Sequence, residues 1–367
     1  MFNVMNIVLF AVLIFILLLD MKVAKKGTYI EKSLSLDACK ALQGFFGLLI
    51  IIHHIYTFLN TRGYMVEQIQ WSARIGVYLI GFFFFCSGYG LMTSLRIKKD
   101  YLEGFVVKRV CIVLVPFFIS NYAYMFVEQL KGVRYTPIEL ICSFFGLLLQ
   151  NTQMWFAVEI MLLYLLFSLL FKYIKNEKLV IIIITALVMI MTIFSMLVFD
   201  KGKYINWFVG EWWYNTTPLF ILGMIVAKKQ EKLRQFTLKY YWLILCIAVI
   251  LLVIFGTCAR RMLQSHGYWT MLITDKLITY LVQLPSVILF ELVVILVMMK
   301  IKVGNRLLSF LGKFALEELL ISGTFLNGFI FLLDRYGFVC YLCLSFIATM
   351  FLSILLYRLK RIILELR

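Results

Sequence analysis

The chain has 367 residues, of which 63% are hydrophobic and 15% are charged, and its mean hydropathy is +0.96. Soluble domains carry roughly 25% charged residues, so this composition excludes an ordinary soluble protein. The formal net charge of +17 could indicate nucleic-acid binding, but Lys and Arg occur in short clusters between long apolar runs. Such clusters are typical of the flanks of membrane spans, and we therefore reject the nucleic-acid interpretation.

The apolar runs predict about eleven membrane-spanning helices, since a span needs roughly 20 mostly apolar residues. The first run is expected to be a retained span, because no basic residue precedes it and no small-residue cleavage site follows before Met21. Pro137–Gln150 is too short and is predicted to be re-entrant or interfacial. The predicted spans are Asn3–Leu19, Leu42–Leu59, Ile75–Leu95, Val110–Phe126, Trp155–Phe171, Leu179–Phe199, Trp213–Ala227, Tyr241–Thr257, Leu277–Met299, Leu307–Leu333 and Phe338–Tyr357.

The basic residues predict the orientation, because most of them fall in alternate connections between the spans. The positive-inside rule then places the amino terminus outside and the carboxyl terminus in the cytoplasm. No long hydrophilic segment is present, so any chemistry must take place within the helices. Most of the eight cysteines lie inside apolar runs and have no His at ligand spacing, so neither a disulfide framework nor a metal site is predicted. The expected fold is an all-α, polytopic transmembrane helical bundle.

The second predicted span carries the most informative polar residues. From Leu42 to Leu59 the only residues that ionise near neutral pH are His53 and His54, and polar groups inside a membrane are commonly functional. At about 100° per residue, Gln43 and His54 lie on one face of this helix. A neutral imidazole in a dry site can take a proton from a hydroxyl, as acyl transfer requires. Alternatively, one or both histidines only hydrogen-bond to a neighbouring helix.

Residues at the predicted cytoplasmic ends of the first helices could hold a phosphorylated ligand. Lys40 and Gln43 are one turn apart and suit an anionic or carbonyl-bearing group. A second set suits the phosphates of a nucleotide diphosphate, and it comprises Ser87, Gly88, Tyr89, Gly90, Lys98, Lys99, Lys108 and Arg109. The alternative is that Lys40 is an interfacial anchor and that the other basic residues are ordinary cytoplasmic flanks.

Acidic residues also lie inside predicted spans, namely Glu159, Glu291, Glu317 and Glu318. Carboxyl groups in a membrane are costly unless they are paired or face an aqueous cavity. They could orient His54, bind a sugar hydroxyl or relay protons. Alternatively, each could form a structural pair with a buried Lys or Arg.

Aromatic residues gather on the predicted outer side, and glycines recur on the second and third spans. Aromatic rings stack on saccharides, but they also collect at membrane interfaces without binding anything. Glycines allow helices to approach closely. The aromatic residues are Trp155, Phe156, Trp207, Trp212, Trp213 and Tyr214, and the glycines are Gly44, Gly47, Gly81, Gly88 and Gly90.

Taken in order, these segments resemble the bacterial acyltransferase 3 membrane proteins from about Ser35 to Tyr357. The first-helix signature of that family, in which a basic residue and Gly precede a catalytic His, resembles LDACKALQGFFGLLIIIHH. The second-helix SGF or SGY segment resembles FFFFCSGYGLM, and the Arg-rich stretch ending in Pro resembles GFVVKRVCIVLVPFFISNY. The Trp-Phe helix resembles WFAVEIMLLYLLF, and the late Gly-Lys-Ser-Tyr-Leu-His region resembles FLGKFALEELLISG.

The chain departs from the family pattern at several positions. Gln43 stands where the family usually has Arg, and Lys40, one turn earlier on the same face, would supply the missing charge. Val113 replaces a common second Arg. In the late signature, Ala315 and Ser322 occupy positions where Ser and His are frequent, which puts the usual activity or substrate in question.

The resemblance implies an integral-membrane O-acyltransferase, with the acyltransferase domain in residues 35–367 as a ten-helix core. Residues 1–34 would be an additional span and a cytoplasmic linker. The protein would transfer an acyl group, with acetyl as the expected group, from cytoplasmic acyl-CoA to a hydroxyl of an extracytoplasmic glycan or cell-surface polysaccharide. His54 would act as general base or transient acyl carrier, oriented by His53 or Glu159.

The resemblance also implies the remaining site residues and partners. The donor acyl-CoA would contact Lys40, Gln43, Ser87, Gly88, Tyr89, Lys108 and Arg109, and the acceptor would contact Trp155, Trp212, Trp213 and Tyr214. The expected setting is the bacterial cytoplasmic membrane, with membrane lipid and a glycan or lipid-linked saccharide as partners, and self-association into a homo-oligomer is left open. The alternatives are a proton-coupled transporter or flippase of lipid-linked saccharides, and a catalytically degenerate assembly partner.

Overall fold

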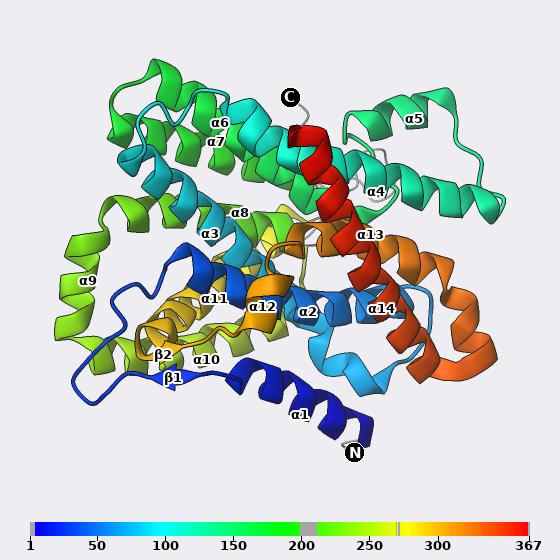
Figure 1. Ribbon diagram of the computed structural model, residues 1–367, viewed down its shortest axis with the longest axis horizontal. Coiled ribbons are helices and arrows are strands. Elements are labelled where there is room, and N and C mark those ends of the chain that lie inside the picture. Colours follow the sequence, from blue (N-terminus) through cyan, green and yellow to red (C-terminus); the bar gives the residue numbers. More distant parts are fainter. Residues whose placement is uncertain (1–3, 199–210, 269, 271, 366–367) are drawn as a thin grey trace.

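The computed structural model describes residues 4–198, 211–268, 270 and 272–365, and they form a helical bundle with only two very short strands (Figure 1). The predicted all-α class is confirmed. In chain order the elements are α1 (Val4–Leu18), β1 (Lys22–Val23), α2 (Leu36–Asn60), η1 (Glu67–Arg74), α3 (Gly76–Ile97), η2 (Val106–Val110), α4 (Cys111–Leu130), α5 (Pro137–Phe144), η3 (Thr152–Met154), α6 (Trp155–Tyr173), α7 (Glu177–Val198), α8 (Glu211–Lys228), α9 (Gln230–Lys239), α10 (Tyr241–Ser265), α11 (Ile273–Lys300), β2 (Ile301–Lys302), α12 (Arg306–Leu311), α13 (Ala315–Gly328) and α14 (Ile330–Glu365).

Within this described part, 8 helices are long and apolar enough to cross a membrane, namely α2, α3, α4 with the preceding η2, α6, α7, α10, α11 and α14. The surface of α10 shows why a lipid environment is required. Its exposed side chains include Trp242 at 65%, Val253 at 63% and Ile250 at 59%. So much exposed apolar surface on one helix is unfavourable in water and suits hydrocarbon. The chain is therefore a multi-pass membrane protein.

Three predicted spans do not reach this length and hydropathy. They correspond to α1 with 15 residues, to α8 with the internal Pro218, and to the segment Leu307–Leu333. The prediction of one continuous helix over Leu307–Leu333 is wrong, because the chain breaks at Gly312 into α12 and the 14-residue α13. Gly312 lies directly against the backbone carbonyl of Lys40, so the break occurs where α2 crosses this segment. Pro137–Gln150 contains only the 8-residue α5.

Glycines set the two closest helix crossings in the core. At Gly44 a side chain would collide with the backbone of α12, and at Gly88 it would collide with the Phe220 carbonyl of α8. Backbone contacts this close are available only to glycine. The predicted close approach at Gly44, Gly47, Gly81 and Gly88 is confirmed. The prediction for Gly90 is wrong, since nothing lies within 4 Å of the position its Cβ would take.

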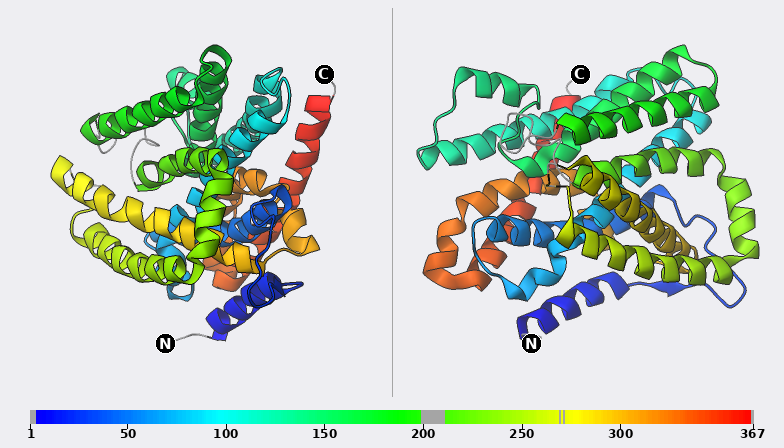
Figure 2. Two further views of the ribbon diagram at one scale, coloured as in Figure 1. Left: turned by 90° about the vertical axis from the view of Figure 1, so that its left-hand side faces the viewer. Right: turned by 180° about the vertical axis from the view of Figure 1, so that it is seen from behind.

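The helix α1 lies along one edge of the molecule in all views (Figures 1 and 2), while α2 occupies the interior. The ring of Phe10 on α1 packs 4.8 Å from that of Trp71 on η1. After α1, the chain pairs antiparallel with β2, with Lys22 opposite Lys302 and Val23 opposite Ile301. This pairing ties the amino-terminal segment to the end of α11, next to the start of α12.

Candidate active site

Two helices, α2 and α13, run side by side in the same direction and position the central polar residues. The order of contacts shows this direction, because Gly44 meets α12, Gly47 meets Glu318, and His54 reaches Ser322. The helix α2 begins where the Ser35 side chain accepts a hydrogen bond from the Ala38 amide at 3.4 Å. Gln43 and His54 therefore lie on the same face of α2, with His54 about three turns further along the α2–α13 pair, as the helical spacing predicts.

His54 is held by a hydroxyl from α13. Its Nδ1 lies 3.3 Å from Ser322 Oγ, and this hydroxyl can donate to the Leu319 carbonyl at 3.3 Å or to Gln153 Oε1 at 3.4 Å. A serine hydroxyl has one hydrogen, so once it donates to either oxygen it can only accept from His54. The Nδ1 of His54 then carries the proton, and its Nε2 keeps a lone pair. This is the form of imidazole that acts as a general base.

His53 has a structural environment instead. Its Nδ1 donates to the buried Ser72 carbonyl at 2.7 Å, and its Nε2 packs against Gly76 at the start of α3. The hydrogen bond to a neighbouring element is the alternative that the sequence left open for one of the two histidines. The two rings are 5.9 Å apart, and His53 donates to Ser72 rather than to His54. His53 fixes η1 against α2.

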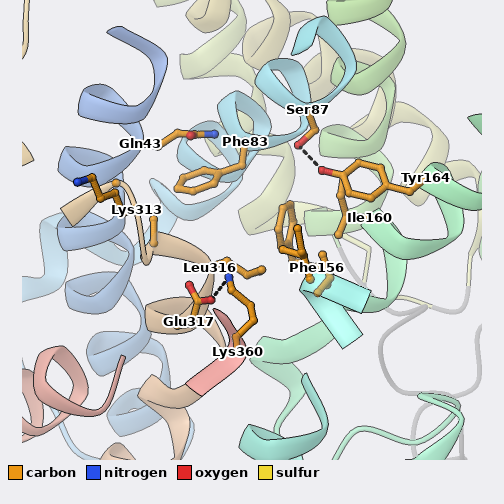
Figure 3. Close-up of a pocket in the computed structure, with 14 residues that line it drawn as sticks. Gln43, Phe83, Ser87, Phe156, Ile160, Tyr164, Lys313, Leu316, Glu317 and Lys360 are labelled. Atoms are coloured by element: carbon orange, nitrogen blue, oxygen red, sulfur yellow. Dashed lines mark hydrogen bonds and ion pairs between the residues drawn. The ribbon is translucent and has the colours of Figure 1, made fainter. Parts of the chain in front are cut away.

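A cavity of about 200 Å³ opens at the Gln43 level (Figure 3). Gln43 and Lys313 lie on one side of it, Ser87 and Tyr164 lie opposite, and the Glu317–Lys360 ion pair forms a further part of the wall. The Tyr164 hydroxyl donates to Ser87 Oγ at 3.4 Å. The remaining lining residues are Phe83, Ile112, Val113, Phe156, Ile160, Gly312, Ala315 and Leu316.

Of the residues predicted to bind acyl-CoA, only Gln43 and Ser87 line this cavity. Gly88 is used in helix packing, and the ring of Tyr89 stacks on Phe85 with centroids 6.0 Å apart. Three basic residues of the set also lie off the cavity wall. Lys40 is partly buried, with its backbone carbonyl against Gly312. Lys108 donates to the Glu103 carbonyl at 3.2 Å, and Arg109 donates to the Tyr101 hydroxyl at 3.1 Å.

His54 is not among the residues that line the cavity. The helix rises by about 1.5 Å per residue, so roughly 16 Å along α2 separates Gln43 from His54. Between these levels, the Glu318 carboxyl lies against Gly47, and the described residues offer no hydrogen-bond partner to either of its oxygens.

The buried acids take two different roles. Glu317 pairs with Lys360 of α14, so for this residue the predicted ion pair with a buried base is confirmed. Glu159 and Glu291 are also buried, and Glu159 Oε2 and both oxygens of Glu291 have no hydrogen-bond partner within the described ranges. No hydrogen bond joins Glu159 to His54 among the residues described, so an orienting role for Glu159 rests on no direct contact.

The aromatic residues proposed for an acceptor are largely enclosed. Trp155 is 8% exposed and its ring stacks on Phe84 at 5.9 Å, and Tyr214 is fully buried 5.0 Å from the ring of Tyr268. Neither presents a free ring face to a sugar. The side chains of Trp212 and Trp213, and all of Trp207, lie outside the described residues.

A polar cluster that sequence reasoning missed lies at the His54 end of the bundle, where α4 and α13 end. Lys131 donates to the Asn327 side chain at 2.8 Å, and the Asn327 amide donates to Glu128. Asp334, seven residues after Asn327 in the chain, accepts a hydrogen bond from the Tyr64 hydroxyl at 3.3 Å. These residues follow apolar helices and read in sequence as ordinary flanks, so only packing brings them together.

A bundle of membrane helices with a serine-bound imidazole inside and a polar cavity at one end defines the class of the protein, an integral-membrane protein with a polar site among its helices. The model of the acyltransferase 3 family, which is described as an acyltransferase domain, matches residues 35–358. The chain therefore belongs to this membrane acyltransferase family. No curated protein and no solved structure is significantly similar to the chain.

Proposed function

We propose that this protein is an O-acyltransferase that takes an acyl group from acyl-CoA at the cytoplasmic face and transfers it to a hydroxyl on the other side of the membrane. Acetyl is the acyl group we favour, and an extracytoplasmic glycan or cell-surface polysaccharide is the acceptor. The observation that carries the proposal is the His54–Ser322 contact on the α2–α13 pair, because it engages Nδ1 of the imidazole within the bundle and leaves Nε2 to act as the base. The family match supports the reaction class.

In the proposed reaction, His54 Nε2 removes the proton from the acceptor hydroxyl while the hydroxyl oxygen attacks the thioester carbonyl carbon. The carbon–sulfur bond then breaks, and the proton returns from His54 to the departing thiolate. The thioester enters from the Gln43 cavity, whose Ser87, Tyr164 and Gln43 side chains offer hydrogen bonds to an amide-rich arm. The acceptor arrives from the opposite end of α2, near the polar cluster of Glu128, Lys131 and Asn327.

The setting proposed for this reaction is the bacterial cytoplasmic membrane, with the amino terminus outside and the carboxyl terminus in the cytoplasm. The distribution of basic residues supports this orientation. It also agrees with the site, because the cavity with Lys313 and Lys360 is then at the donor side.

The test is acyl transfer from radiolabelled acetyl-CoA by the purified protein in lipid nanodiscs, with a cell-envelope glycan fraction as acceptor. His54→Ala is expected to lower transfer by roughly 10²–10⁴-fold, the usual contribution of a general base. His53→Ala provides a matched control for loss of one imidazole, with its effect expected mainly on stability. Unchanged transfer by His54→Ala, with the thermal stability of the wild type, would refute the proposed role.

A second candidate function is a proton-coupled transporter or flippase of lipid-linked saccharides. The buried Glu291 and Glu318 favour it, since unpaired intramembrane carboxyls are typical of proton pathways. Absence of turnover by the wild type with any acyl-CoA, together with pH-driven saccharide movement in vesicles, would favour this function. A degenerate assembly partner would show neither activity.

A further inference from the structure

A second hollow, which we name the α12–α14 groove, lies between α12 and the final turns of α14. Its volume is about 480 Å³, within the range of roughly 300–1,000 Å³ that is usual for small-molecule sites. The residues that line it are Phe310, Lys313, Phe314, Ile354, Tyr357, Arg358, Arg361, Ile362 and Glu365.

The groove carries excess positive charge. Lys313 and Arg358 are exposed, and neither side chain forms an ion pair or hydrogen bond with any residue that the structure describes. Arg361 also lines the groove, but its guanidinium already donates to Glu365 at 2.8 Å. Two cations are thus free to bind an anion. Arginine binds phosphate oxygens in a bidentate manner, and lysine binds them as a point charge.

The same groove has an aromatic wall. The rings of Phe310 and Phe314 pack edge to face at 5.0 Å, and Tyr357 faces the groove from α14. Basic and aromatic side chains together suit a ligand that joins phosphate groups to a flat heterocycle, because aromatic rings stack on bases. An anionic lipid headgroup would use the basic residues but has no ring to stack on this wall.

The groove adjoins the Gln43 cavity. Lys313 lines both, and Lys360 of the cavity lies 5.1 Å from the ring of Tyr357 in the groove. A ligand with a bulky charged head and a slender arm could therefore occupy both. The cavity, at about 200 Å³, is the narrower part and would take the arm.

We propose that the α12–α14 groove binds the phosphorylated nucleotide end of the acyl donor, with Lys313 and Arg358 at the phosphates and Tyr357 beside the base. This inference rests on the proposed acyl-CoA-dependent function. It assigns acyl-CoA binding to residues that the sequence did not single out. Lys108 and Arg109, the sequence candidates for this role, are bonded elsewhere and lie off both hollows.

The experiment measures binding of coenzyme A and of S-acetylpantetheine, which lacks the nucleotide, to the full chain in nanodiscs of phosphatidylcholine. We expect Arg358→Ala and Lys313→Ala each to weaken coenzyme A binding about tenfold or more, because a hydrogen bond to a charged group contributes roughly 1.5–3 kcal/mol. Binding of S-acetylpantetheine by Arg358→Ala should remain at the wild-type value. Lys232→Ala, which removes one exposed charge from α9, is the matched control and should bind coenzyme A normally.

The outcomes separate this inference from the proposed function. If the wild type binds coenzyme A and Arg358→Ala binds it equally well, the groove assignment is wrong while the acyltransferase proposal stands. If the wild type binds neither ligand, both fail. A groove for anionic lipid would appear as wild-type coenzyme A affinity in Arg358→Ala, combined with loss of retained phosphatidylglycerol in native mass spectrometry, and that result also overturns the inference.

Discussion

The Glu317–Lys360 ion pair provides a quantitative test of the packing around the Gln43 cavity. The two side chains are 0% and 8% exposed, and they join α13 to α14. Lys360→Met keeps an unbranched apolar side chain and removes the ammonium group. Glu317 Oε1 then loses its partner, and Oε2 already has none among the described residues.

Removing one member of a buried pair typically costs about 3–5 kcal/mol, because the remaining charge stays buried without compensation. The next residue of the same helix gives the control. Arg361 pairs with Glu365, but these side chains are 59% and 65% exposed, and exposed pairs contribute only about 0–1 kcal/mol. Lys360→Met should therefore lower the free energy of unfolding by at least about 2 kcal/mol more than Arg361→Met.

The assay is denaturant-induced unfolding of the purified protein in detergent micelles, followed by circular dichroism. The double variant Glu317→Leu/Lys360→Met should recover most of the loss, since an apolar pair of similar volume often replaces a buried ion pair without cost. Equal destabilisation by Lys360→Met and Arg361→Met would refute the reasoning, because the ion pair of Lys360 would then contribute no more to stability than the exposed pair of Arg361.

Three further predictions address packing, positioning and pH. Gly88→Ala should destabilise the protein by roughly 1–3 kcal/mol through collision with α8, whereas Gly90→Ala, with open space, should stabilise α3 by up to about 1 kcal/mol in the same unfolding assay. Ser322→Ala should lower kcat up to about tenfold and alter the pH–rate profile, while Ser322→Thr retains both. Hydrogen bonds from Thr136 lower the pKa of Glu139, so the capping contribution to α5 is present above the unfolded carboxyl pKa and is lost as pH falls through the folded pKa. A fall in the hydrogen-exchange protection factors of the α5 amides at acidic pH, absent in Thr136→Ala, checks this.

Much of the architecture followed from local sequence patterns. Hydropathy located the helices, since each apolar run of sufficient length must satisfy its backbone hydrogen bonds internally in lipid. Helical periodicity placed Gln43 and His54 on one face of α2, and the structure shows both directed toward the α12–α13 segment or the cavity beside it. The family resemblance over most of the chain also followed from ordered local motifs and is confirmed by the family match.

The tertiary structure decided which of these residues meet. Ser322, 268 residues from His54 in the chain, holds the imidazole, whereas the adjacent His53 is bound to Ser72. Lys360 reads as a cytoplasmic flank after an apolar run, yet it turns inward to Glu317. Trp155 and Tyr214 read as interfacial aromatics, yet neighbouring rings cover them.

Composition and periodicity therefore determined the helices, the membrane setting and the face that carries His54. They could not determine its partner, the break between α12 and α13, or the groove beside Lys313. The physical reason is that hydropathy and helical spacing describe the environment along one segment. Contacts between segments depend on where glycines such as Gly44 and Gly312 allow two backbones to touch, and that arises only when the whole chain packs.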